Sequence, residues 1–159
     1  MSPSRLPASD RSSTPGRGLG AVGTTRLELE IPSDVDCIES VVEVVRRECE
    51  AFGFPSRHLT LNVPVALTEA LSNAILRGNN GDPARLVRVR IAVDRREVVV
   101  EVQDEGEGFD LQGCTGDPNR KDDRMREDGR GLFLMRALMD RVERFDRDGN
   151  VVRLTLRRP

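Results

Sequence analysis

The sequence lacks several residue types on which other classes of protein depend. It has no Trp and no Tyr, so aliphatic side chains must build most of the core. His58 is the only histidine, and Cys37, Cys49 and Cys114 form no CxxC pair, which argues against a zinc site. An odd number of cysteines without an export signal is typical of free thiols in a reducing cytoplasm.

Long apolar runs and an excess of one charge are also missing. No apolar run approaches the roughly 18 residues that a membrane span requires, and the N-terminus has no apolar signal region. The 25 basic and 27 acidic residues leave a net charge of −2, and the arginines are interleaved with Asp and Glu. This pattern indicates a solvated surface of mixed sign. The sequence therefore predicts a cytoplasmic protein that binds neither nucleic acid nor membrane.

The length of 159 residues suits one domain rather than two. Residues 1–23 are rich in Ser, Pro, Gly and Arg and show no periodicity, which predicts a flexible N-terminal tail. Residues 24–159 are then predicted to form the folded domain.

Apolar periodicity predicts the order of the elements in that domain. Residues 25–31 alternate as a strand that stops at Pro32, and Ser33 is a candidate N-cap for the helix that follows. The further predictions are helices over 34–52, 56–79 (kinked or restarted at Pro64) and 130–141, and hairpins over 85–104 and 141–158. This order favours an α+β fold, a two-layer α/β sandwich with a mixed, mostly antiparallel sheet and helices on one face.

Two polar residues share a stripe of the otherwise apolar helix over 56–79. Glu69 and Asn73 lie four residues apart and therefore project to the same side. Exposure to solvent is the ordinary explanation for such positions. The functional alternative is a polar cleft, where an amide oxygen ligates Mg²⁺ and a carboxylate orients or deprotonates a nucleophile.

Two glycine motifs follow later in the chain. Asp104 ends a strand before Gly106 and Gly108, where it either starts a turn or accepts a hydrogen bond from the exocyclic amine of a base. Gly129 and Gly131 are predicted to open a helix, as a plain entry turn or as a phosphate site made of free N–H groups. No Walker A sequence is present.

The segment of about 109–130 between these motifs is predicted to be a lid. A stretch this long without regular structure is usually functional or disordered. Its basic residues are alternative contacts for a γ-phosphate, and the sequence does not choose among Lys121, Arg124, Arg126 and Arg130.

In this order, the segments EALSNA, DEGEGF and GRGLFLM resemble the N, G1 and G2 boxes of the GHKL ATPases, which share the Bergerat ATP-binding fold. Over roughly residues 25–158 the chain is similar to the anti-sigma-factor serine kinases of the RsbW type. The resemblance implies that Asn73 binds Mg²⁺, that Glu69 is the general base and that Asp104 binds the adenine amine. It also implies an adenine pocket shaped by Gly106 and Gly108, and phosphates held at Gly129, Gly131, Leu132 and Phe133.

The function implied by the resemblance is that of an ATP-dependent serine/threonine-protein kinase. It would phosphorylate a serine of an anti-anti-sigma (STAS) protein, switch partners with a sigma factor and act as a homodimer. Arg77 departs from the family pattern, which often has His there, and it either reaches a phosphate or lies on the rim. The alternatives are a non-catalytic ATP-binding anti-sigma module and a detached histidine-kinase ATPase domain.

Overall fold

The computed structural model describes residues 23–106 and 123–159, and the side chains of 123–128 are outside the description. The predicted tail up to residue 22 and the predicted lid up to residue 122, with Gly108, Cys114 and Lys121, therefore lie outside the described residues. The main elements are β1 (Thr25–Pro32), α1 (Ile38–Ala51), α2 (Val63–Asn73), β2 (Leu86–Val93), β3 (Glu97–Asp104), α3 (Asp123–Leu138), β4 (Arg141–Asp146) and β5 (Asn150–Arg157).

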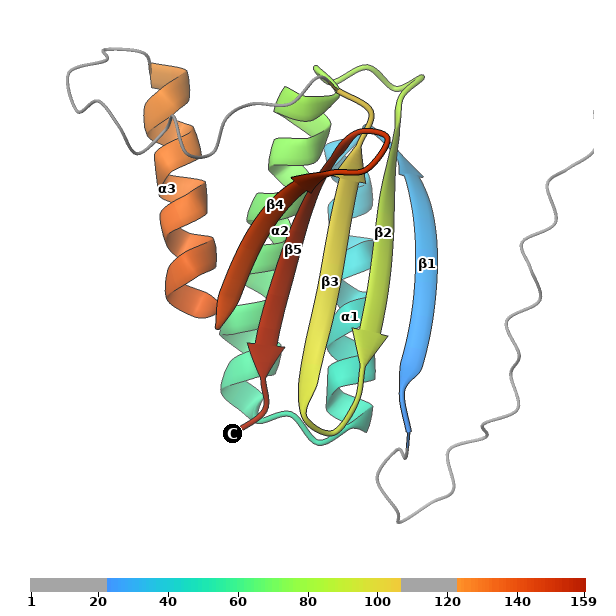
Figure 1. Cartoon of the computed structure of the whole chain (residues 1–159), viewed down its shortest axis with the longest axis vertical. Coiled ribbons are helices and arrows are strands. Elements are labelled where there is room, and N and C mark those ends of the chain that lie inside the picture. Colours follow the sequence, from blue (N-terminus) through green and yellow to red (C-terminus); the bar gives the residue numbers. More distant parts are fainter. Residues whose placement is uncertain (1–22, 107–122) are drawn as a thin grey trace, which may run out of the picture.

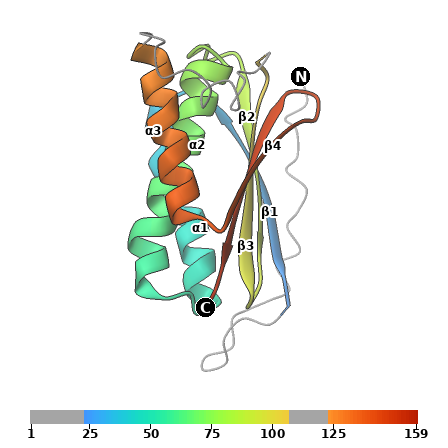
Figure 2. The ribbon, with the colours of Figure 1, turned by 60° about the vertical axis from the view of Figure 1, so that its left-hand side comes forward.

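The five strands form one sheet in the order β1-β2-β3-β5-β4 (Figure 1). All four pairs of neighbouring strands are antiparallel. The three helices cover one face of the sheet, and Figure 2 shows the two layers edge-on. The predicted two-layer α+β sandwich is confirmed, and its described sheet is antiparallel throughout.

The central hairpin shows how the sequence sets the two faces of the sheet. Alternate residues of β2 and β3 are buried toward the helices, as their period-two pattern predicts. At the turn, Asp94 Oδ1 accepts hydrogen bonds from the N–H groups of Arg96 at 2.7 Å and Glu97 at 2.9 Å. The carboxylate thus closes the turn that sets the register of the two central strands.

The entry to the first helix differs from the prediction. Asp34, not Ser33, is the N-cap: its carboxylate accepts the N–H of Asp36 at 2.9 Å and begins a short 3₁₀ turn. The Ser33 hydroxyl instead donates to the carbonyl of Arg85 at 2.7 Å. Ser33 is buried, so it joins two segments far apart in the sequence rather than capping its own helix.

The apolar stripe of α1 packs into the core as predicted. Val41, Val45 and Cys49 are buried. Burial raises the pKa of the Cys49 thiol to about 12, which leaves it a protonated core side chain rather than a reactive group.

α2 is the central part of a longer helical segment, with π-helical turns over His58–Asn62 and Ala74–Gly78 at its two ends. Pro64 lies in the first turn of α2, where the missing N–H is tolerated. The predicted kink or fresh start at Pro64 takes the form of a change from π-helical to α-helical turns, and the helical segment continues through it. The 21-residue helix His58–Gly78 contains an 18-residue window with a mean hydropathy of 1.3, so by length and composition it could cross a membrane, contrary to the prediction. A core helix meets the same criterion, and Leu67, Leu71 and Ile75 are fully buried here.

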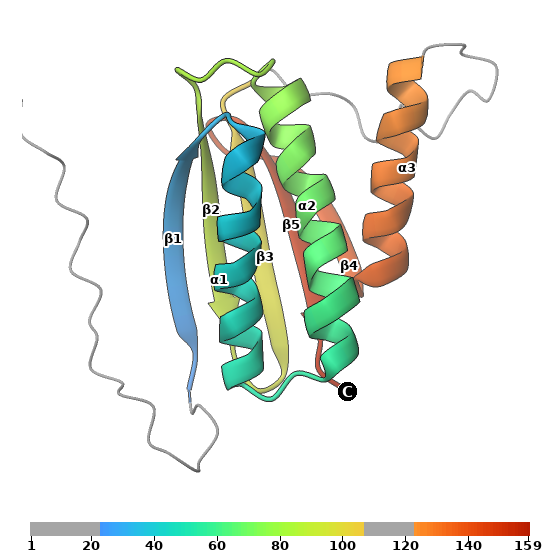
Figure 3. The same cartoon turned by 180° about the vertical axis from the view of Figure 1, so that it is seen from behind.

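α3 begins earlier than predicted. It starts at Asp123 and ends at Leu138, so Gly129 and Gly131 lie inside the helix and do not open it. Figure 3 shows α3 alongside α2, at the β4 edge of the sheet. The missing side chain of Gly131 lets the two helices approach closely, and this packing outweighs the low helix propensity of glycine. The predicted apolar stripe is confirmed: Leu132, Met135 and Met139 are buried.

Candidate nucleotide-binding site

Three segments that are far apart in the sequence meet at one end of the molecule. The last turns after α2, the end of β3 and the β4–β5 turn lie together at the top of Figure 1. The register brings Asp104, the last residue of β3, opposite Asn150, the first residue of β5. The fold therefore collects polar groups where the apolar core ends.

Asp104 is the central acidic group of this end. It is 4% exposed, and its Oδ1 accepts hydrogen bonds from the N–H of Gly106 at 2.9 Å and from Asn150 Nδ2 at 3.0 Å. Burial raises the pKa of Asp104 above its ordinary value, although the bonds from Asn150 and Gly106 and the positive charge of Arg144 oppose that rise. A buried carboxylate with these neighbours suits recognition of a hydrogen-bond donor.

Two glycines let the backbone close around Asp104. A Cβ on Gly78 would overlap the carboxylate of Asp104, and a Cβ on Gly106 would overlap the carbonyl of Gly78. Gly106 belongs to a predicted glycine motif, whereas Gly78 falls at the end of the predicted helix over 56–79 and belongs to no predicted motif. The signal for Gly78 was weak, because its contact with Asp104 joins residues 26 positions apart in the chain.

A buried amide next to Gly78 joins the ends of three strands. Asn79 Nδ2 donates to Ser33 Oγ at 2.9 Å and to the carbonyl of Leu86 at 3.0 Å. Its Oδ1 accepts the N–H of Glu105 at 2.8 Å. Asn79 thereby fixes the residue directly after Asp104, a role that the sequence analysis did not identify.

Glu69 and Asn73 face α3 across the groove between the two helices. A Cβ on Gly131 would lie 3.0 Å from Glu69 Oε2 and 3.4 Å from Asn73 Nδ2. Both side chains are half-buried. The fold thus brings together the acid and the amide of one predicted motif and a glycine of another, rather than directing the pair to open solvent.

The amides predicted to hold phosphate lie in the interior of α3. Leu132 points into the core, and Phe133 is 70% exposed. All of them lie beyond the first four positions of the helix, which are residues 123–126. At such later positions, N–H groups bond to the carbonyls four residues back. Gly129 has open space around its Cα. Arg77 is half-buried in the turn before Gly78.

The chemistry of the donor set fits a Mg²⁺ ion that arrives with a nucleotide. The described residues include no group of three His, Cys, Asp or Glu side chains that would hold a metal by themselves. Asn73 offers one amide oxygen, and Glu69 a carboxylate one helical turn away. Protein-bound Mg²⁺ commonly uses one or two protein groups together with substrate phosphates and water.

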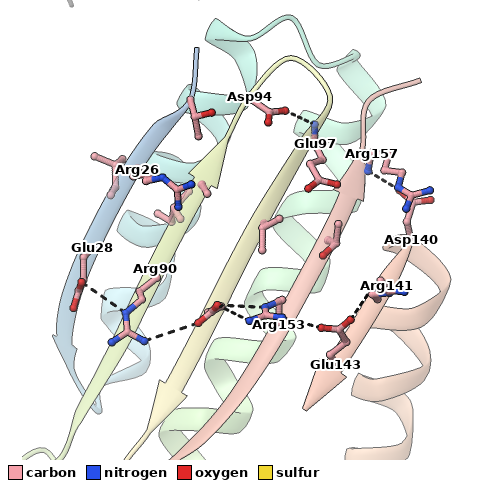
Figure 4. Close-up of a pocket in the computed structure, with 17 residues that line it drawn as sticks. Arg26, Glu28, Arg90, Asp94, Glu97, Asp140, Arg141, Glu143, Arg153 and Arg157 are labelled. Atoms are coloured by element: carbon pink, nitrogen blue, oxygen red, sulfur yellow. Dashed lines mark hydrogen bonds and ion pairs between the residues drawn. The ribbon is translucent and has the colours of Figure 1, made fainter. Parts of the chain in front are cut away.

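A separate hollow lies on the opposite face of the sheet (Figure 4). Its lining is dominated by Arg, Glu and Asp side chains of the strands, and it includes none of Glu69, Asn73 and Asp104. Several arginines there pair with neighbouring glutamates, as Arg153 does with Glu101 and Glu143 at 3.1 Å. We therefore assign the nucleotide chemistry to the helix side of the fold.

Comparison with known proteins identifies the family of the chain. A family model described as Histidine kinase-like ATPase domain matches residues 31–156. The serine-protein kinase RsbW of Bacillus velezensis is 29% identical over 136 residues, which cover 81% of this chain and 83% of the relative. The RsbW of Bacillus subtilis is 28% identical over the same shares, and that of Oceanobacillus iheyensis is 26% identical over 74% of this chain and 77% of the relative.

A solved structure shares the fold. The crystal structure of the RsbU and RsbW domains of a Mycobacterium tuberculosis protein superposes with a TM-score of 0.60 at 18% sequence identity. The match covers 85% of this chain and 33% of the other, so the chain spans about a third of that longer protein. At this identity the match supports the fold alone.

Proposed function

Because the chain belongs to the histidine kinase-like ATPase domain family, we propose that residues 24–159 bind ATP with Mg²⁺ and phosphorylate a serine of a partner protein. The observation that carries the proposal is the close approach of Glu69 and Asn73 to Gly131, with the buried Asp104 held by Asn150 at the end of β3. The curated relatives are named serine-protein kinases, which supports this choice of reaction.

Each residue has a role that suits its chemistry. Asp104 accepts the exocyclic amine of adenine, and Gly106 with Gly108 shapes the surface against the base. Asn73 ligates Mg²⁺, which neutralises phosphate charge when it is bound. Glu69 orients or deprotonates the acceptor serine hydroxyl. Phosphoryl transfer needs little covalent work from the protein, so positioning and charge neutralisation carry most of the rate.

The phosphates require a change in α3. We propose that they bind the N–H groups at Gly129, Gly131, Leu132 and Phe133. These groups become available when the helical turns before them unwind, because the amides are otherwise bonded within α3. Glycine at two of the four positions lowers the cost of that unwinding by about 1 kcal/mol each relative to Ala.

The partners follow from the family resemblance. We propose that the acceptor serine belongs to an anti-anti-sigma STAS protein, and that a sigma factor competes with it for the kinase in the cytoplasm. The kinase acts as a homodimer in this proposal. The RsbW relatives support a regulatory kinase of this kind.

Glu69→Gln tests the catalytic role. The substitution keeps the size of the side chain and leaves Asn73 in place, so ATP binding should stay near that of the parent protein. Phosphorylation of the STAS protein should fall by about 10²–10⁴-fold, the usual contribution of general-base assistance. Glu39→Gln, an exposed substitution in the first turn of α1, is the matched control and should leave both measurements unchanged.

The competing function is a module that binds ATP and sequesters a sigma factor without phosphorylating anything. If the parent protein binds ATP and the sigma factor but transfers no phosphate to any STAS protein, that function is correct. If the parent protein is active and Glu69→Gln is equally active, the kinase assignment stands and the role of Glu69 is wrong.

A further inference from the structure

Asn150 makes contacts that its position at a turn does not require. It is 4% exposed, and its Nδ2 donates to Asp104 Oδ1 and to the carbonyl of Gly106, both at 3.0 Å. Both hydrogens of the amide are therefore used on the segment that holds Asp104. In the sequence, Asn150 is only one residue of the predicted hairpin over 141–158.

Arg144 on β4 fixes the orientation of this amide. Its Nη2 donates to Asn150 Oδ1 at 3.3 Å. If the amide were flipped, its NH₂ group would face the guanidinium and its oxygen would face the carboxylate, and both contacts would be repulsive. The row Arg144–Asn150–Asp104 therefore has a single favourable direction, in which every donor meets an acceptor.

The hairpin is built to bring Asn150 to this place. Gly149 has a φ of +135°, a conformation that other residues rarely adopt, and a Cβ there would overlap the carbonyl of Asp104. Asn150 follows directly and pairs with Asp104 in the strand register. Close packing at the turn thus sets the amide against the carboxylate.

The two oxygens of Asp104 are left in different situations. Oδ1 receives the N–H of Gly106 and the amide of Asn150. Oδ2 lies against the Cα of Gly78 and receives neither of these two bonds. A ligand amine that approaches this end therefore meets one acceptor oxygen, already oriented and with its partner oxygen occupied.

We propose that Asn150, supported by Arg144, is the positioning residue that presents Asp104 Oδ2 as an ionised acceptor and so selects adenine over hypoxanthine nucleotides. This inference rests on the proposed function, in which Asp104 binds the base. An ionised carboxylate only accepts, so it bonds the 6-amino group of adenine and repels the 6-oxo group of hypoxanthine. A protonated carboxyl would not distinguish the two bases in this way, because its O–H group can donate a hydrogen bond to the 6-oxo group of hypoxanthine.

The charges around Asp104 determine how strongly its ionisation depends on Asn150. Burial raises the pKa of Asp104, whereas Asn150 and the positive charge of Arg144 lower it. Glu105 is next in the chain, but its carboxylate accepts the N–H of Leu86 at 2.8 Å. Arg77 precedes Gly78 on the helical side. Loss of Asn150 therefore removes a main contribution that keeps the carboxylate ionised.

Asn150→Ala tests the inference through nucleotide selectivity. We expect ATP affinity, measured by calorimetry at pH 7, to fall about tenfold, in line with a hydrogen bond to a charged group. ITP affinity should change less, so the preference for ATP narrows. The loss should shrink as the pH rises, because deprotonation of Asp104 restores the acceptor. Unchanged ATP/ITP selectivity and an unchanged pH profile would overturn the inference.

Asn62→Ala is the matched control. Asn62 also uses its side-chain amide, donating to the carbonyl of Leu138 at 2.7 Å, but it lies before α2, far along the helical segment from Gly78. A purely structural loss should lower the melting temperature in both variants, whereas only Asn150→Ala should alter selectivity. If Asn150→Ala does not fold, Asn150→Ser retains a donor and should show the same changes in weaker form.

Titration of the Asp104 carboxyl by NMR, without nucleotide, separates this inference from the proposed function. The pKa of Asp104 should be higher in the Asn150 variant than in the parent protein. An identical titration would overturn the inference. Failure of the parent protein to bind ATP would overturn the proposed function and the nucleotide selectivity that rests on it. The titration needs no ligand, so it would still test whether Asn150 keeps the Asp104 carboxylate ionised.

Discussion

Charged side chains are arranged differently on the outer face of the sheet and at the end of the sheet where β3 finishes. On the outer face, a row of alternating acids and bases crosses all five strands: Glu28, Arg90, Glu101, Arg153, Glu143 and Arg141 (Figure 4). At the end of the sheet, Asp104 is nearly fully buried and is held by amides instead of a salt bridge within the described part of the chain. Each charged side chain of the row has an ion-pair partner, whereas Oδ2 of Asp104 receives neither of the two hydrogen bonds that hold Oδ1.

This difference separates stability from function. Exposed ion pairs contribute about 0–1 kcal/mol each, because water screens them and ordering long side chains costs entropy. A buried carboxylate costs stability, as the raised pKa of Asp104 indicates. In the proposed function, this cost falls on the group that binds the base. The larger array of charges, by contrast, is a solvated surface.

Gly78→Ala should have the largest effect at the buried end. The added Cβ overlaps the carboxylate of Asp104, so the carboxylate or the backbone must move. We expect ATP affinity to fall about 100-fold, because the charge-assisted bond is worth about 1.5–3 kcal/mol. Stability should fall by about 1–3 kcal/mol, the usual cost of overpacking. Calorimetry and thermal denaturation measure the two effects, and parent-like ATP affinity would show that Gly78 does not shape the site.

Asp104→Asn should weaken ATP binding by several-fold to a hundred-fold while relieving a cost to stability. Since the folded pKa of Asp104 is raised, the parent protein loses stability as the pH rises from the ordinary value of 3.8 through the folded pKa. The Asn variant lacks this loss. Urea unfolding without nucleotide should therefore favour the variant progressively as the pH rises from about 4 through the folded pKa of Asp104, and the difference should level off above it. A pH-independent difference between the two proteins would contradict the buried carboxylate.

Gly129→Ala distinguishes a helix interior from a helix entrance. If α3 runs through residue 129, as the structure shows, Ala should stabilise the nucleotide-free protein by up to about 1 kcal/mol. If ATP unwinds this part of α3, the same substitution should weaken ATP binding by several-fold. Chemical denaturation and calorimetry test the two effects separately, and a loss of stability would favour the entrance predicted from the sequence.

Glu101→Gln should have the smallest effect, although Glu101 pairs with Arg90, Arg147 and Arg153. We expect a loss below about 1 kcal/mol that shrinks further in high salt, with ATP affinity unchanged. Denaturation at two salt concentrations measures it. A large loss of ATP binding in this variant would contradict the assignment of the site to the helix side.

Local periodicity was enough to predict most of the fold. The alternation in β2 and β3 and the apolar stripe of α1 reflect geometry that repeats every two or 3.6 residues, so a short window of sequence reveals them. Glu69 and Asn73 could be paired for the same reason, because residues four apart share a helix face. The order of the three motifs then placed the chain in its family.

Tertiary contacts decided the remainder, because they join residues that no short window includes. Asp104 contacts Gly78 and Asn150, which are 26 and 46 positions away in the chain. No short window of sequence therefore marks either residue as a partner of Asp104. The glycine motif likewise predicted that the helix starts near residue 130, whereas α3 already starts at Asp123. Gly131 lies inside the helix, where it packs against Glu69. The sequence by itself determined which faces are apolar and which motifs are present. Only the folded chain decided which oxygen of the Asp104 carboxylate accepts the two hydrogen bonds from Gly106 and Asn150, because that depends on close packing between separate strands and helices.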